Sequence, residues 1–261
     1  MQELTDAFNR SHPCLGMVCV ILLIVSTIGC AILCWKDRKS FFSASISTGS
    51  PLRLTLPDYY IVTVFIVLIF LGLAGPMTDL LLAIIALIIW KLRTRSVHTY
   101  LHLTARGVFK VLGLGLMIAL GVYLPLELLS DTIEKVLQSF GRPPSVQEAV
   151  KLFLQAKTPG EVIPLLGLAI LAAPIAEEFF FRGVIYPAAK CIVSPNYAML
   201  LSSFLFAALH RNLPSLIPLM LLGMLLCRVF ERTGSLWTGI LIHATFNAVS
   251  AIFIFVARFY S

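Results

Sequence analysis

The chain has 261 residues, of which 59% are hydrophobic and only 13% are charged. A soluble domain of this length cannot bury so much apolar surface, so the composition excludes an ordinary soluble domain and indicates a membrane protein. The net charge of +7 comes from basic residues in short clusters between apolar segments, which is typical of cytoplasmic loops and excludes a nucleic-acid-binding face.

Eight apolar segments near the length of a bilayer span follow one another along the chain. We expect membrane helices at residues 15–35, 58–75, 77–91, 107–129, 161–189, 196–211, 213–231 and 235–259. The third and sixth are short for a complete span, which suits a tilted, re-entrant or protein-shielded helix. The predicted fold is an all-α, polytopic transmembrane bundle of about eight helices.

Charged residues outside the apolar segments set the expected orientation. Basic residues crowd the loops after the first and third expected helices, which places both loops in the cytoplasm and both termini outside. The same alternation puts Lys190, Arg228 and Arg232 on the cytoplasmic side. We expect the first apolar segment to be an uncleaved span, because Glu3 and Asp6 precede it and no A-x-A cleavage site follows.

Residues 131–160 differ in composition from the segments on either side. They carry charges of both signs around the sequence Gly141-Arg142-Pro143-Pro144. We expect a short extramembrane connector with one or two amphipathic helical stretches. It would divide the chain into N-terminal transmembrane helices, residues 1–130, and a C-terminal helical core, residues 161–261.

Ionisable side chains inside membrane helices are costly, so each one needs a partner or a function. In this chain nearly all of them follow residue 170 and fall in three of the expected helices. They are Glu177, Glu178 and Arg182 in the fifth helix, His210 at the end of the sixth, and His243 with the polar Asn247 in the eighth. This asymmetry indicates a polar site in the C-terminal core.

The two adjacent glutamates of the fifth expected helix face different directions. Glu178 precedes Arg182 by four residues, which is the favourable spacing and order for an ion pair on one helix face. Glu177 projects about 100° away around the helix and has no charged partner in its own helix. A carboxylate placed in this way suits general-base chemistry. The alternative is that all three charged residues only lock helices together.

Two further pairs lie at helical spacing. His243 and Asn247 are four residues apart, so a ring N–H and an amide could donate together to a developing oxyanion, although a helix-to-helix hydrogen bond is the simpler reading. His210 shares a face with Phe206, and alone it would be read as an interfacial hydrogen-bonding group. At about 1.5 Å per residue, the four candidates lie within one layer about 10 Å deep, so we expect one shared site.

Three motifs, in this order on separate helices, resemble the CPBP family of intramembrane proteases. They are Glu177-Glu178-x-x-x-Arg182, Phe206-x-x-x-His210 and His243-x-x-x-Asn247. The family includes the CAAX prenyl endoproteases and the bacterial Abi and bacteriocin-immunity proteins, and the resemblance covers about residues 160–255. The resemblance gives residues 161–261 the character of a protease-like catalytic core.

The resemblance also implies a role for each motif residue. Glu177 and His210 would activate the attacking water, His243 and Asn247 would stabilise the oxyanion, and Glu178, Arg182 and Phe206 would support the site. The expected function is an intramembrane endopeptidase of the CAAX prenyl protease type. It would act on a peptide or protein substrate at the lipid bilayer, in a bacterial plasma membrane.

A metal ion is left open by the sequence. Members of the family are often described as metalloproteases, and Glu177, His210 and His243 are candidate ligands for zinc or another divalent metal. The chain has no HExxH motif, and the proposed chemistry does not require a metal.

Two other classes of function use the same polar residues. A peptide- or bacteriocin-binding immunity protein would recognise its partner without cutting it. A transporter would use Glu177 and the histidines as a proton relay, but the paired broken helices of an inverted repeat are not recognisable in the sequence. Formation of a cleaved product separates the first alternative from a peptidase, and flux through proteoliposomes tests the second.

Overall fold

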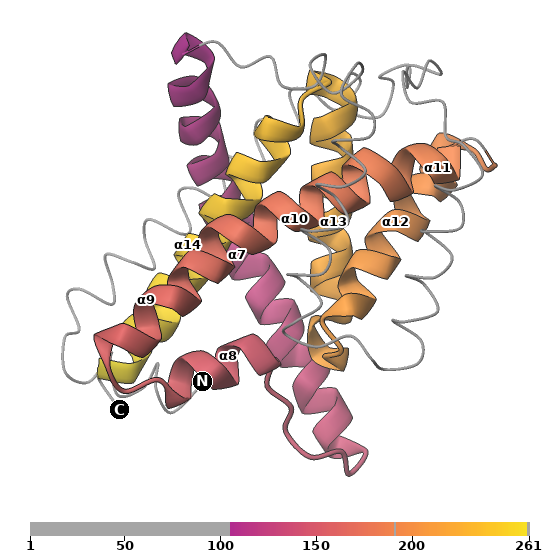
Figure 1. Cartoon of the computed structure of the whole chain (residues 1–261). Coiled ribbons are helices and arrows are strands. Elements are labelled where there is room, and N and C mark those ends of the chain that lie inside the picture. Colours follow the sequence, from indigo (N-terminus) through magenta and orange to yellow (C-terminus); the bar gives the residue numbers. More distant parts are fainter. Residues whose placement is uncertain (1–104, 191, 260–261) are drawn as a thin grey trace.

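The computed structural model describes residues 105–190 and 192–259, and the regular structure in these ranges is entirely helical (Figure 1). Four helices are long and apolar enough to cross a membrane: Leu112–Ser139, Pro159–Lys190, Leu213–Thr233 and Leu236–Val256. The all-α membrane fold is therefore confirmed for these residues. The spans expected at 15–35, 58–75 and 77–91 lie outside the described residues, so the total of about eight stays a prediction.

The first described helix, α7, spans Ala105–Ser139 and is ten residues longer at its C-terminal end than expected. The charges that follow residue 130 end the apolar stretch, but they do not end the helix. Asp131 and Lys135 form an ion pair of 2.7 Å at helical spacing, which supports continued helix. The chain leaves the helix at Gly141, whose φ of +80° is readily adopted only by glycine.

The expected connector is therefore helical in its first part and contains one further short helix. That helix, α8, spans Glu148–Gln155. The side chain of Phe153 on α8 is buried, whereas Glu148 and Lys151 form an exposed ion pair. The amphipathic character expected for this part of the chain is present in α8.

The helix from Pro159 to Lys190 is interrupted by two π turns. Its parts are α9 (Pro159–Gly167), η1 (Leu168–Ala172), α10 (Ala173–Phe180), η2 (Phe181–Ile185) and α11 (Tyr186–Lys190). Each π turn is followed by a helical segment whose second residue is proline, Pro174 or Pro187. A proline has no N–H and its ring clashes with the carbonyl four residues earlier, so a widened turn accommodates it. The two π turns bracket Glu177 and Glu178.

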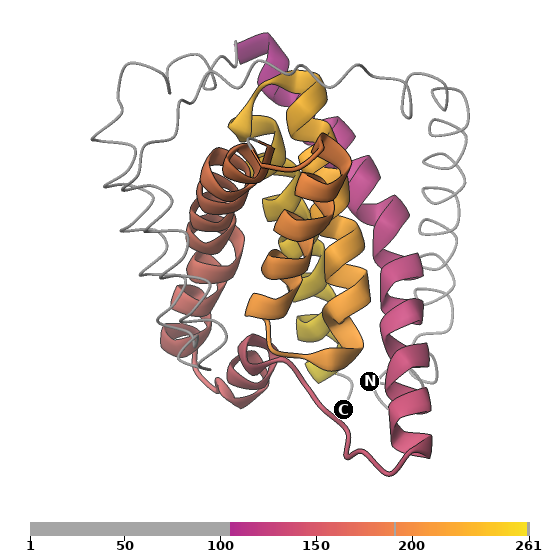
Figure 2. The same ribbon diagram turned by 90° about the vertical axis from the view of Figure 1, so that its right-hand side faces the viewer.

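Three helices complete the bundle: α12 (Pro195–Leu209), α13 (Leu213–Thr233) and α14 (Leu236–Phe259). Their bounds differ from the expected ones by no more than two residues, and α12 is short, as expected. Helix α14 packs along α7, and α12 packs along α13 (Figure 2). The segment α9–α11 crosses both pairs, with η2 and α11 against α12 and α10 against α14.

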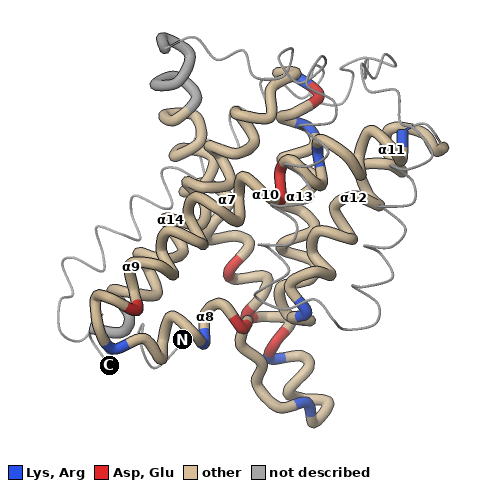
Figure 3. Tube along the Cα trace, viewed as in Figure 1, with Lys and Arg blue, Asp and Glu red and all other residues tan. Residues whose placement is uncertain are grey.

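The ends of α11 and α13 lie together. Lys190 at the end of α11 forms an ion pair with Glu231 near the end of α13, at 2.5 Å. This contact places Lys190 and the adjacent Arg232 at the same end of the bundle, which agrees with the orientation expected from the positive residues. Figure 3 shows charged positions mainly towards the helix ends, with an acidic position also on α10.

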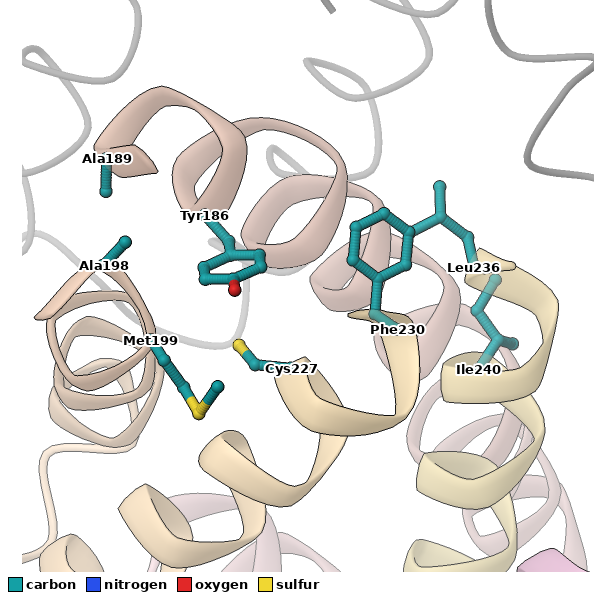
Figure 4. Close-up of a cluster of buried hydrophobic side chains, with 8 residues drawn as sticks. All are labelled: Tyr186, Ala189, Ala198, Met199, Cys227, Phe230, Leu236 and Ile240. Atoms are coloured by element: carbon teal, nitrogen blue, oxygen red, sulfur yellow. The ribbon is translucent and has the colours of Figure 1, made fainter. Parts of the chain in front are cut away.

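Two apolar clusters hold α10 and α11 in place. One lies at the Lys190 end and joins α11 to α12, α13 and α14 through the residues Tyr186, Ala189, Ala198, Met199, Cys227, Phe230, Leu236 and Ile240 (Figure 4). The other packs α10 against α12, and its rings Phe180, Phe181 and Phe206 contact edge to face at 5.4 Å. Since lipid offers no hydrophobic driving force, such close packing and the polar contacts below hold the helices together.

Candidate active site

A buried ion pair lies at the centre of the bundle. Arg182 Nη1 donates to Glu178 Oε1 at 2.7 Å, and both residues are 0% exposed. Arg182 Nη2 also donates to the carbonyl of Gly223 on α13, at 2.9 Å, and its guanidinium lies 4.8 Å from the ring centre of Phe206 on α12. The expected ion pair is therefore present, and its arginine ties η2 to two other helices.

His243 of α14 lies between the two adjacent glutamates of α10. Its Nδ1 atom is 3.1 Å from Glu178 Oε1, and its Nε2 atom is 3.8 Å from Glu177 Oε2. The ionised Glu178 carboxylate only accepts hydrogen bonds, so Nδ1 carries the proton and Nε2 is the nitrogen that faces Glu177. Glu177 is 4% exposed and His243 is 2% exposed, so the pair is enclosed by protein.

Gly239 makes room for this arrangement and was not anticipated from the sequence. It lies one helical turn before His243, where a Cβ atom would be only 2.7 Å from Glu178 Oε2. Any side chain there would displace the carboxylate that holds the imidazole. In the sequence, Gly239 is recognisable only as a glycine four residues before a histidine in an apolar helix, and this pattern alone is weak evidence for a close contact.

Phe206 links the two histidines. Its ring centre lies 5.2 Å from that of His210 and 5.6 Å from that of His243. His210 is half-buried at the C-terminal end of α12, and its Nδ1 lies 3.0 Å from the carbonyl oxygen of Phe206. A carbonyl only accepts, so Nδ1 is again the protonated nitrogen and Nε2 is available for other contacts. Phe206 therefore contacts both histidines, and its supporting role in the site stays a prediction.

The turn after His210 is fastened to the connector. Arg211 has a φ of +50°, which is uncommon for a residue with a side chain, and Asn212 then caps α13 by accepting from the Ser215 N–H at 3.1 Å. Asn212 Nδ2 donates to Ser145 Oγ and to the Ser145 carbonyl, each at 3.3 Å. Gln147 Nε2 donates to Ser215 Oγ at 2.8 Å. These contacts were not expected, although Asn212-x-x-Ser215 is a recognisable helix start.

Asn247 lies on α14 one turn beyond His243 and contacts a different part of the crossing helix. Its Nδ2 atom donates to the carbonyl of Ala169 in the π turn η1, at 2.8 Å. The structure thus brings Glu177, Glu178, Arg182 and His243 into one contiguous group, with His210 joined to it through Phe206. The amide of Asn247 makes the helix-to-helix hydrogen bond that the sequence left open as an alternative.

The candidate metal ligands do not fit a metal site. Within residues 105–190 and 192–259, no three His, Cys, Asp or Glu side chains converge as a metal ion requires. Glu177 and His243 approach each other, but His210 does not complete a ligand set with them. We therefore derive the chemistry of the site from the side chains alone.

Comparison with known proteins finds a family model that resembles part of these helices. Residues 159–249 match the family model described as "Type II CAAX prenyl endopeptidase Rce1-like". These residues are similar to the Rce1-like family, and the match covers about a third of the chain. The matched segment contains all seven expected site residues, from Glu177 to Asn247. The resemblance to the CPBP proteases is confirmed by this match. The four apolar helices indicate an integral membrane protein.

One curated relative of the chain comes from a bacterium. The chain is 26% identical over 125 residues to "Putative membrane peptidase YdiL" of Bacillus subtilis (strain 168), a match that covers 48% of this chain and 49% of the relative. The aligned part is thus about half the length of that relative. No solved structure matches the chain significantly.

Proposed function

We propose that residues 159–249 form an intramembrane endopeptidase centre in which Glu177 acts as the general base on a water molecule. The observation that supports this most directly is the 3.8 Å separation of Glu177 Oε2 and His243 Nε2 inside an apolar bundle. The separation is too long for a direct hydrogen bond, but it allows one water molecule to contact both atoms. Burial of the two side chains strengthens the electrostatic effect of each on that water.

Different residues act on the attacking water and on the developing oxyanion. Glu177 accepts a proton from the water as the water oxygen attacks the carbonyl carbon of the substrate peptide bond. His210, whose ring packs against Phe206, orients this water. The site reacts in the form in which the His243 ring already carries a proton on both nitrogens, so Nε2 donates a hydrogen bond to the developing oxyanion and keeps its proton throughout. Glu177 then delivers its proton to the leaving amine as the C–N bond breaks. Every step uses side chains of this chain.

Glu178 and Arg182 fix the imidazole in this scheme. Glu178 receives hydrogen bonds from Arg182 and from Nδ1 of His243, which sets the ring orientation and directs Nε2 towards Glu177. We propose a CAAX-type substrate, a peptide cut near its membrane-associated C-terminal region, on the basis of the Rce1-like match. A bacterial plasma membrane is the proposed location, on the basis of the bacterial relative.

Product analysis tests this proposal. The purified protein in liposomes is incubated with a C-terminal CAAX peptide, prenylated or unmodified, and the products are identified by mass spectrometry. We expect release of the terminal tripeptide by the native chain and none by Glu177→Ala or His210→Ala variants with unchanged thermal unfolding. Undiminished cleavage by both variants would overturn the mechanism. Peptide binding without any product would instead favour the immunity-protein alternative.

A further inference from the structure

The carbonyl of Ala169 has no hydrogen-bond donor in its own helix, and the reason lies in the sequence. In the π turn η1, the N–H of Ala173 bonds to the carbonyl of Leu168, five residues earlier. The next N–H in line would belong to residue 174, which is proline and has none. The Ala169 carbonyl therefore lacks a backbone hydrogen-bond donor within a membrane-spanning helix.

Asn247 supplies the missing donor from another helix. Its Nδ2 atom lies 2.8 Å from the Ala169 oxygen, a good hydrogen-bond length. In lipid, a proline inside a helix is tolerated when a neighbouring side chain satisfies the carbonyl that the proline releases. Asn247 thus supplies the hydrogen bond that Pro174 cannot make, although the two residues are far apart in the sequence.

The π turn determines which face of α10 meets His243. A π turn contains one extra residue, and each residue rotates an α-helix by about 100°. If η1 relaxed to a regular turn, the helix after Pro174 would shift by one residue, so that Glu177 would take the place of Glu178 and Glu178 that of Phe179. The contacts of His243 with Glu177 at 3.8 Å and with Glu178 at 3.1 Å depend on the present register.

We propose that Asn247 is a positioning residue: its amide replaces the backbone hydrogen bond that Pro174 removes, holds the π turn η1, and thereby directs Glu177 towards His243. This inference rests on the proposed peptidase function for its consequence in catalysis, but the hydrogen-bond replacement itself does not. It differs from a direct role of Asn247 on the oxyanion, because the amide acts through Ala169 and the helix register.

The experiment is a double-mutant cycle in which a proline substitution compensates for the lost amide. Asn247→Ala should lower kcat of peptide hydrolysis by about tenfold or more, with a smaller change in KM. Pro174→Ala/Asn247→Ala regains an N–H at position 174 next to the Ala169 carbonyl, so it should recover most of the lost kcat. Pro187→Ala/Asn247→Ala is the matched control, because it removes the equivalent proline after η2, and it should stay defective.

The outcomes separate the two roles of Asn247. If the amide binds the oxyanion, Pro174→Ala/Asn247→Ala will be as defective as Asn247→Ala, and the proposal is overturned. Thermal unfolding in detergent gives a second readout: Pro174→Ala should raise the unfolding temperature more in the Asn247→Ala background than in the native chain. An equal change in unfolding temperature on Pro174→Ala in the native chain and in Asn247→Ala would also overturn the proposal. If the native chain cleaves no peptide, the proposed function fails, and this unfolding cycle still decides the inference.

Discussion

Gly239 and Glu178 approach so closely that a Cβ atom at position 239 would lie 2.7 Å from the carboxylate oxygen Oε2. Glu178 cannot retreat easily, because its other oxygen accepts from both Arg182 and His243. The small size of residue 239 is therefore a condition for the position of the imidazole.

The Gly239→Ala variant tests this condition. Overpacking of this kind destabilises by about 1–3 kcal/mol, and displacement of Glu178 should lower the peptidase rate by about tenfold or more. Gly167→Ala is the matched control, because a Cβ there meets no atom within 4 Å. Equal activity and equal unfolding temperatures for the two variants would show that Glu178 tolerates the added methyl group.

The Glu178–Arg182 ion pair should behave as one unit in stability measurements. Arg182→Met leaves the fully buried Glu178 charge uncompensated, which costs about 3–5 kcal/mol. Glu178→Gln/Arg182→Met removes both charges and should be more stable than Arg182→Met alone. Reversible unfolding in mixed micelles measures these differences, and the exposed pair Glu148–Lys151 provides a control worth less than about 1 kcal/mol. Additive effects at the buried pair would contradict the coupling.

The turn that carries His210 should depend on the connector. Asn212→Ala removes the cap of α13 and both contacts to Ser145, so we expect faster hydrogen exchange in residues 143–147 and a several-fold lower peptidase rate. Asn196→Ala, an exposed position on α12, should change neither. Unchanged exchange in the connector of Asn212→Ala would show that these contacts do not hold the turn.

Chelation distinguishes the side-chain mechanism from a metal-dependent one. The described residues bring no three metal-ligating side chains together, so treatment with 1,10-phenanthroline should leave the rate of peptide hydrolysis within about twofold of the untreated rate. Loss of activity that returns on addition of zinc, but not of magnesium, would contradict the proposed chemistry.

Within residues 105–190 and 192–259, the sequence predicted the positions of most helices and of the polar layer well, because both depend on local spacing. The ion pair between Glu178 and Arg182 follows from residues four apart on one helix. The meeting of Glu177 with His243 was expected only as a shared depth in the membrane, and the structure gives it an atomic contact of 3.8 Å. The continuation of α7 to Ser139 was missed, because charged residues mark the end of an apolar stretch rather than the end of a helix.

The contact of Asn247 shows what spacing alone cannot predict. Its four-residue separation from His243 places both side chains on one face of α14, but the choice of partner depends on the backbone of the crossing helix. Only the π turn η1 and the missing N–H of Pro174 expose the Ala169 carbonyl to the amide. The same holds for Asn212 and Ser145, whose contact requires the connector to fold back over the end of α12.

The central claim is that Glu177 removes a proton from the attacking water. The most direct measurement is the rate of peptide hydrolysis in H₂¹⁸O by the native chain and by Glu177→Gln, with exposed Glu148→Gln as the control. We predict ¹⁸O in the new carboxylate, a loss of about 10²–10⁴-fold for Glu177→Gln at an unchanged unfolding temperature, and no loss for the control. A folded Glu177→Gln variant that hydrolyses the peptide at the native rate would contradict the account.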